Sequence, residues 1–181
     1  MRSPGQNTRR PQQRRRGSAL IEFTLVGTFI FLPMLAGLAT VGMNMVTAMQ
    51  VENLTASAGQ MFSAGWDFTN PTNVSMLRAM AGTLQTSSTG SGVVILSEVQ
   101  YTSNGLVCSN QITTVIGSAG YTGTSQYCAG GAVTAAFTAL MPMTVVGQTA
   151  YVAESYYNNP QFAWALAPAG TSTGIYQKAI F

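Results

Sequence analysis

The longest hydrophobic segment of the chain predicts one membrane-spanning helix near the N-terminus. From Phe23 to Val51 there are 29 consecutive residues without a charge, and a spanning helix needs only about 20 apolar residues. Beyond Glu52 the pattern becomes amphipathic but keeps one apolar face, formed by Val51, Leu54, Ala58, Met61 and Phe62. We therefore predict one helix over residues 18–63, membrane-spanning in its first half, with an end at Gly65 or Asp67.

The remaining residues, 64–181, predict a small extracytoplasmic α+β domain. Asn70-Pro71-Thr72 is typical of a turn into a second helix, whose apolar positions are Val74, Leu77, Ala81 and Leu84. The segment from Thr86 to Gly92 contains only Ser, Thr and Gly residues, which indicates a surface loop. The helix of residues 18–63 is expected to pack on a small antiparallel sheet.

Alternating and β-branched patterns mark the strands of that sheet. The segment from Val93 to Tyr101 alternates apolar and polar positions. Asn104-Gly105 is a two-residue hairpin signal that returns the chain through Cys108. Val145–Tyr157 predicts another strand, and Ile175–Phe181 predicts a last edge strand or a short helix.

Charge divides the chain at Gly17. Six of the eight basic residues precede it, namely Arg2, Arg9, Arg10, Arg14, Arg15 and Arg16, whereas two basic residues and five acidic ones follow. Clustered Arg beside a first apolar segment keeps that end in the cytoplasm, so residues 1–17 predict a disordered cytoplasmic leader and an extracytoplasmic C-terminal domain. The acidic body argues against a nucleic-acid partner, because binding phosphates requires a basic surface.

Composition also argues against an enzyme. The chain has no His and only two Cys, which removes His-dependent catalytic arrangements and His-based metal sites. It also lacks a glycine-rich phosphate loop ending in Lys-Ser/Thr. Glu98 and Glu154 could work as a pair, but we expect them to be solvated positions on strands. We predict no catalytic residue, no metal site and no cofactor.

Glu22 is the anomaly of the apolar segment, because a carboxylate near one end of a membrane helix is unfavourable without a partner. Three alternatives exist for this N-terminus: an ordinary signal cut near Gly37-Leu38-Ala39, an uncut single-span anchor, and cleavage directly after Gly17. Glu22 would be a poor start for a signal core, and apolar residues persist beyond Ala39. Both observations favour cleavage between Gly17 and Ser18.

This arrangement resembles the prepilin cleavage motif of the type IV pilin superfamily. Its elements are the run Arg14-Arg15-Arg16, then Gly17, four residues, and Glu22-Phe23 at the start of the apolar helix. Within that superfamily, the leader and the length resemble TadE-like minor pilins, or pseudopilins, of the tight-adherence (Flp) pilus. The segment Ala150–Tyr157, with Pro160 and Ile175-Tyr176 after it, resembles the closing segment of that family.

The resemblance implies a function in pilus assembly. A prepilin peptidase of the bacterial inner membrane would cut between Gly17 and Ser18, and Glu22 would pair with the free amine of a neighbouring pilin subunit. An ammonium and a carboxylate attract strongly in a low dielectric, so the pair would replace two unpaired groups. Alternatively, Glu22 reaches the membrane interface and complements the helix dipole. Partners would be the peptidase, other pilin subunits and pilus assembly proteins, with possible incorporation into an extracellular pilus.

Cys108 and Cys128 are expected to form a disulfide, because both lie outside the membrane in this topology and an oxidising compartment favours pairing. Closing a loop of this length would stabilise the fold by about 3 kcal/mol. Two free thiols would instead require a cytoplasmic domain, which the Arg run contradicts.

A second functional hypothesis is a single-span or signal-cleaved envelope protein whose small domain binds a partner or ligand.

Overall fold

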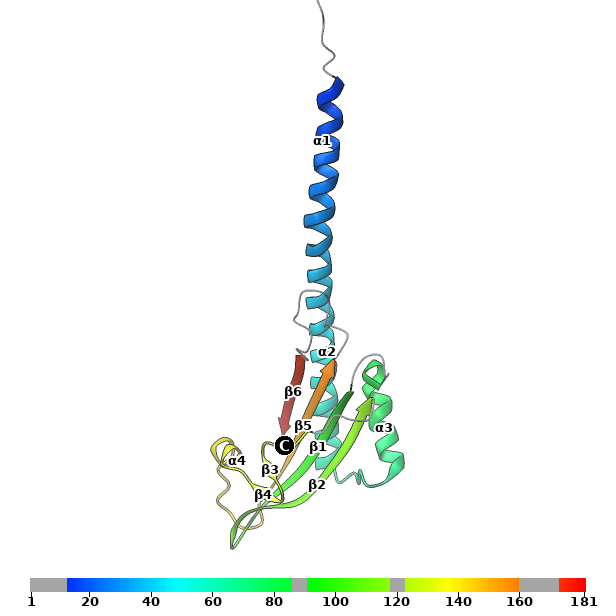
Figure 1. The fold of residues 1–181 in the computed structure, drawn as a ribbon. Coiled ribbons are helices and arrows are strands. Elements are labelled where there is room, and N and C mark those ends of the chain that lie inside the picture. Colours follow the sequence, from blue (N-terminus) through cyan, green and yellow to red (C-terminus); the bar gives the residue numbers. More distant parts are fainter. Residues whose placement is uncertain (1–12, 86–90, 118–122, 160–172) are drawn as a thin grey trace, which may run out of the picture. The chain divides into compact units, whose positions relative to one another are not determined.

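The computed structural model describes residues 13–85, 91–117, 123–159 and 173–181, which belong to two compact units, Met1–Met43 and Asn44–Phe181. The described part of the first unit is helical throughout. It comprises α1 (Gln13–Val26), a π-helical turn, η1 (Gly27–Phe31), and the beginning of α2 (Leu32–Ser63) (Figure 1). In this uncut chain the helix begins at Gln13, so residues 13–16, which we expected in the disordered leader, are helical. Gln and Arg are good helix formers, which is consistent with this extension.

The π-helical turn η1 ends at Phe31, two residues before Pro33. Proline has no N–H, so the carbonyl four residues earlier, that of Phe29, loses its usual helical donor. Phe29 lies within η1. The helix therefore accommodates Pro33 by a local widening of one turn, a common response to an interrupted hydrogen-bond ladder.

In the second unit, α2 ends at Ser63, which confirms the predicted end near Gly65. Gly65 adopts a positive φ of 86° and its N–H donates to the carbonyl of Phe62 at 3.0 Å, which closes the helix. The predicted second helix is also confirmed as α3 (Pro71–Ala81), followed by the 3-10 turn η2 (Gly82–Gln85). Asn70 caps α3, because its side-chain oxygen accepts from the N–H of Thr72 at 2.9 Å.

The domain contains a four-stranded antiparallel sheet in the order β2-β1-β5-β6, which confirms the α+β class (Figure 1). Its strands are β1 (Ser91–Thr102), β2 (Gly105–Gly117), β5 (Thr149–Asn159) and β6 (Thr173–Ile180). Between β2 and β5 lie the short hairpin β3 (Cys128–Ala129) and β4 (Ala132–Val133), and the helix α4 (Ala135–Leu140). The surface loop was expected from Thr86 to Gly92: residues 86–90 lie outside the described residues, and the expectation is wrong for Ser91 and Gly92, which already belong to β1 and pair with β2 and β5.

The structure shows where the predicted strands begin and end. The β1–β2 hairpin is confirmed, but its two loop residues are Ser103 and Asn104, because Thr102 pairs with Gly105. Gly105 has a φ of 108° and starts β2. The strand predicted from Val145 begins only at Thr149; the side chain of Gln148 accepts the N–H groups of Thr144 and Val145 and holds them in a turn. Of the two alternatives for the last segment, the strand is correct.

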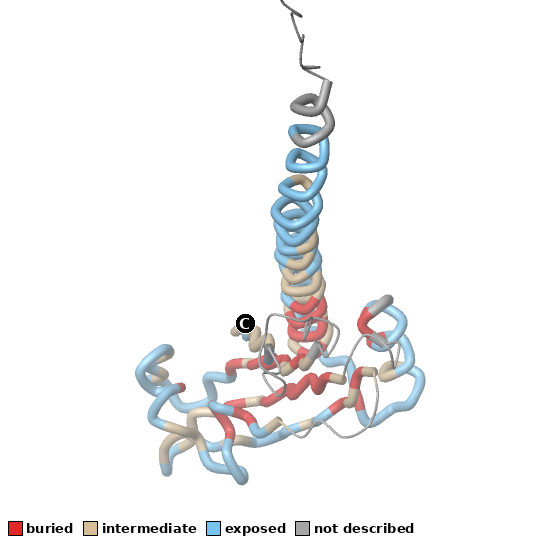
Figure 2. The backbone as a smooth tube through the Cα atoms, turned by 45° about the horizontal axis from the view of Figure 1, so that its top comes forward, coloured by how far each residue is buried: buried red, intermediate tan, exposed pale blue. Residues whose placement is uncertain are grey.

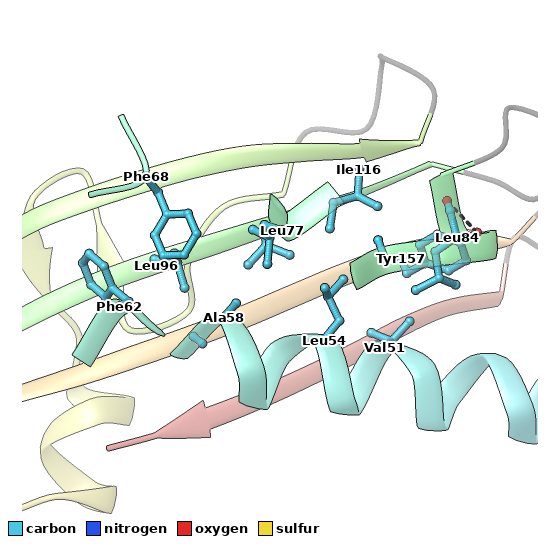
Figure 3. Packing of buried hydrophobic residues seen from close by; sticks show 13 residues of the cluster. Val51, Leu54, Ala58, Phe62, Phe68, Leu77, Leu84, Leu96, Ile116 and Tyr157 are labelled. Carbon is cyan, nitrogen blue, oxygen red and sulfur yellow. Dashed lines mark hydrogen bonds between the residues drawn. The ribbon is translucent and has the colours of Figure 1, made fainter. Parts of the chain in front are cut away.

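One face of the sheet packs on α2 and α3 and forms the main core (Figure 3). The apolar face predicted for residues 51–62 is the one that packs there, since Val51, Leu54, Ala58 and Phe62 are all buried. Gly59 allows a close approach here, since an added Cβ would collide with the ring of Phe181 and lie 3.1 Å from the Cβ of Ala153. Thr55 adds a buried hydrogen bond to Ser155 of β5 at 2.7 Å.

The opposite face of the sheet is covered by the chain between β2 and β5. This second cluster contains the buried residues Val99, Tyr127, Cys128, Phe137, Ala150 and Val152. Figure 2 shows that buried residues concentrate on the two central strands of the domain, β1 and β5. Because both faces are covered, the central strands are buried on both sides, and polar side chains on them must find partners within the protein.

Candidate functional site

The candidate processing segment lies within α1. The backbone of Arg14, Arg15, Arg16, Gly17 and Ser18 is helical, and the side chains described in this unit begin at Ala19. A glycine inside a helix lowers its stability by roughly 1 kcal/mol relative to alanine. Gly17 therefore lowers the stability of this part of α1.

Glu22 and Phe23 follow one turn later on a fully exposed part of the helix. Both side chains are exposed, Phe23 to 76 %, and they are followed by exposed apolar side chains including Leu25, Val26, Phe29 and Ile30. The helix over Ala19–Ser63 has a mean hydropathy of 2.0 in its most apolar 18-residue window, and none of that window is buried. An apolar surface of this extent requires a cover, which a bilayer or neighbouring helices would supply.

Three hydroxyl groups on this apolar helix donate to backbone carbonyls of the same helix. Thr24 donates to the carbonyl of Leu20 and Thr28 to that of Thr24, both at 2.8 Å, and Thr40 donates to Ala36 at 2.7 Å. Such pairing removes the cost of placing a hydroxyl in hydrocarbon. The helix is therefore compatible with lipid along the stretch that carries these three threonines.

In the domain, Cys108 of β2 and Cys128 of β3 form the predicted disulfide, with their Cα atoms 6.0 Å apart. β2 has a β-bulge between the β1 pairs of Cys108 and Asn110, where Ser109 is left without a partner on β1. Side chains alternate between faces along a strand. Because of the extra residue, Cys108 and Gln111 lie on the same face although they are three positions apart, and the Gln111 amide donates to the Cys128 carbonyl at 2.9 Å.

Glu154 corrects a sequence prediction, because we expected it to be solvated and it is completely buried, with 0 % of its surface exposed. Its Oε1 accepts the N–H of Gln126 at 2.8 Å and the hydroxyl of Tyr176 at 2.9 Å. Its Oε2 accepts the hydroxyl of Ser125. Three donors from two separate segments therefore converge on one carboxylate of the central strand β5.

The network extends beyond the carboxylate. Ser125 Oγ accepts the N–H groups of Tyr127 and Cys128 at 3.1 and 2.9 Å, and so fixes the turn that leads into the disulfide. Lys178, the β6 residue opposite Glu154, donates to the Tyr127 hydroxyl at 2.6 Å. Burial and the nearby Glu154 carboxylate raise the pKa of Tyr176, which keeps its hydroxyl protonated and able to donate.

The two strand carboxylates cannot act as a pair. Glu98 and Val99 are adjacent on β1, and Val99 lies on the face covered by the β3–β4 segment, so Glu98 points to the helix-covered face. Glu154 points to the same face as Val99, because Val152 and Ala150 on its strand belong to that cluster. The sequence signal for Glu154 was available: it is the sole charge in β5. What the sequence did not show is that both faces of β5 are covered.

The fold and these sites define an α+β protein with one N-terminal helix, Ala19–Ser63, that is long and apolar enough to span a membrane, and with a disulfide in its domain. No protein-family model, no curated protein and no solved structure matches the chain.

Proposed function

We propose that this chain is a TadE-like minor pilin, processed by a prepilin peptidase between Gly17 and Ser18 and involved in assembly of a tight-adherence (Flp-type) pilus. The observation that carries the proposal is the order of features at the N-terminus. A basic run and a glycine precede an acid and an aromatic residue, Glu22 and Phe23, on a helix whose surface is apolar and exposed. The pilin-like character of the fold is part of the same proposal.

The mechanism has two steps, both in the N-terminal unit. Hydrolysis of the Gly17–Ser18 peptide bond removes the basic leader and creates a free amine on Ser18. The Glu22 carboxylate of an adjacent subunit then pairs with that amine in the low dielectric of the membrane. The pair offsets the desolvation of both charges, and the exposed apolar surfaces of the two helices cover each other.

The domain supports an extracytoplasmic location in this proposal. Its Cys108–Cys128 disulfide is typical of proteins in oxidising compartments. The Arg run beside the first apolar segment favours the same orientation, with the N-terminus in the cytoplasm and the domain outside the inner membrane. The chain would act as a peptidase substrate and a structural subunit, with no catalytic residue, cofactor or nucleic-acid partner.

The test is the N-terminal residue of the protein extracted from its native membrane. Ser18 is the expected result. An N-terminus at Thr40 would indicate an ordinary secretory signal, and Met1 would indicate an uncut anchor; either result would contradict the proposal. Both outcomes fit the second candidate, a membrane-anchored or secreted envelope protein whose domain binds a partner.

A further inference from the structure

The Cys108–Cys128 disulfide is poorly accessible to thiols in the folded domain. Cys128 is only 1 % exposed and Cys108 is half-buried. Cys128 belongs to the apolar cluster on the second face of the sheet, together with Phe137 and Val152. In thiol–disulfide exchange a thiolate attacks one sulfur and the other sulfur leaves with the electron pair, so the rate depends on access to the attacked sulfur and on the leaving group.

Both possible attacks on this disulfide are unfavourable while the domain is closed. Attack on Cys128 requires a path to a sulfur that the protein covers. Attack on Cys108 releases the thiolate of Cys128 among apolar side chains, where a charge without a partner is strongly disfavoured. Efficient exchange therefore requires that Cys128 first becomes exposed.

Cys128 lies within residues 123–134, which we call the covering segment, and side chains from three strands hold this segment on the sheet. Three of them each donate one hydrogen bond: Gln111 of β2 to the Cys128 carbonyl at 2.9 Å, Tyr156 of β5 to the Thr124 carbonyl at 2.9 Å, and Lys178 of β6 to the Tyr127 hydroxyl at 2.6 Å. Glu154 of β5 accepts two, from Ser125 and Gln126. These bonds help to determine how often the segment lifts from the sheet, because local opening must break them.

We propose that thiols and disulfides exchange with Cys108–Cys128 only while the covering segment is lifted, and that the hydrogen bonds of Glu154 control this opening. In the open state a dithiol reagent bonds to one sulfur and the S–S bond breaks. The second thiol of the reagent then closes the reagent's own disulfide, so two electrons and two protons pass to the two cysteines. This inference concerns the domain alone and does not depend on the proposed pilus function.

The first test is the rate at which dithiothreitol reduces the full chain in detergent micelles, measured by alkylation of the new thiols and mass measurement. A minor open state is typically about 0.1–10 % populated, so reduction should be about 10- to 1,000-fold slower than in denaturing urea, where the disulfide is exposed. Equal rates in the two conditions would overturn the proposal.

The second test changes the bonds that hold the segment. Glu154→Gln should speed reduction in micelles by at least about tenfold, because the loss of a buried acceptor raises the population of the open state. Glu98→Gln, on the helix-covered face, is the matched control and should change the rate by less than about twofold. An unchanged rate in Glu154→Gln would contradict control of the opening by this carboxylate.

Leu77→Ala distinguishes lifting of the segment from unfolding of the whole domain. Leu77 of α3 is fully buried in the cluster on the helix-covered face, so its truncation destabilises the domain without altering the covering segment. Local opening predicts that Leu77→Ala changes the reduction rate by less than about twofold. An acceleration equal to that of Glu154→Gln would assign the exchange to global unfolding and overturn the proposal.

Tyr156→Phe keeps the test decisive if Glu154→Gln does not fold. It removes only the hydroxyl that donates to the Thr124 carbonyl and keeps the aromatic ring. The expected acceleration is about threefold, because one ordinary hydrogen bond to the segment is lost. In that case a rate equal to that of the parent chain would show that side-chain bonds from the sheet do not limit access to the disulfide.

Discussion

At the scale of single residues, Glu154 connects parts of the domain that are distant in the sequence. Its carboxylate lies on β5, two of its donors lie at Ser125 and Gln126, and the third, Tyr176, lies on β6. A buried polar group that loses its hydrogen-bond partner destabilises the folded state by more than an ordinary hydrogen bond stabilises it. The network therefore fixes the segment that covers the second face of the sheet.

Glu154→Gln should destabilise the domain by about 1–3 kcal/mol, because the amide turns one acceptor into a donor that faces other donors. Urea unfolding of the detergent-solubilised chain, followed by tryptophan fluorescence, measures the effect. Glu98→Gln is the matched control, since Glu98 is only half-buried, and should change stability by less than about 0.5 kcal/mol. Equal effects of the two substitutions would contradict the role given to Glu154.

The raised pKa of Tyr176 predicts that the domain loses stability at high pH. Burial and the Glu154 carboxylate favour the protonated phenol in the folded state, so the folded chain holds this proton at pH values where the unfolded chain has lost it. The contribution of Tyr176 to stability is fully present below the unfolded pKa of about 10 and is lost as pH rises above it. Unfolding curves between about pH 9 and 11 should show this loss. In Tyr176→Phe the decline should be shallower; an identical decline would refute the assignment.

At the scale of elements, the bulge of β2 lets Cys108 and Gln111 share one face of the sheet although they are three positions apart. Cys108 lies opposite Val99, and Ser109 is the extra residue before Asn110. Deleting Ser109 should remove the bulge and leave Cys108 opposite Val99, so the disulfide should still form, which thiol alkylation and mass measurement would detect. Ser109→Ala keeps the residue count and should also keep the disulfide. Free thiols in the deletion variant would show that the bulge itself is needed to position Cys108.

The disulfide itself should contribute about 3 kcal/mol, given its sequence separation of 20 residues. Cys108→Ala with Cys128→Ala is the variant, and urea unfolding is the measurement. Reductant should lower the stability of the parent chain by a similar amount and leave the double variant unchanged. A loss well below 1 kcal/mol would indicate that the Glu154 network holds the segment without the covalent link.

The elements were largely predictable from the sequence, whereas their contacts were not. Periodicity located α2, α3, β1 and β5, because hydrophobic spacing is a local signal. It missed the burial of Glu154, which depends on the segments that cover the sheet, and the bulge at Ser109, which depends on how β2 pairs with β1. Pairing of Cys108 with Cys128 was predictable because no other cysteines exist. The N-terminal motif is read from the sequence alone, and its processing is a matter for experiment.

At the scale of the whole molecule, the proposed function separates processing from assembly. Gly17→Ala should leave the precursor uncut, because the proposed cleavage site includes Gly17 and alanine stabilises the helix by about 1 kcal/mol. Immunoblotting of membranes would show the full-length chain, with the unmodified protein as the processed control. Normal processing of Gly17→Ala would count against recognition of this site.

Glu22→Ala should be cut normally and yet fail to assemble, because the Ser18 amine of a neighbour would lose its carboxylate partner. The readouts are the N-terminal residue of the membrane-extracted protein and its recovery in sheared pilus fractions. Glu22→Asp keeps the charge and should retain more assembly than Glu22→Ala. Unimpaired assembly of Glu22→Ala would rule out the proposed ion pair.

The position of β6 also constrains when the domain can finish folding during synthesis and export. Tyr176 supplies one of the three donors to Glu154, and Phe181 exchanges both of its backbone bonds with Tyr151. Neither contact can form until the chain as far as Phe181 has left the ribosome and, if the domain is extracytoplasmic, has crossed the bilayer. Until then β5 lacks one neighbour and the carboxylate lacks a donor. If the domain is exported while it is being synthesised, an export channel would therefore receive it in an incompletely folded, threadable form.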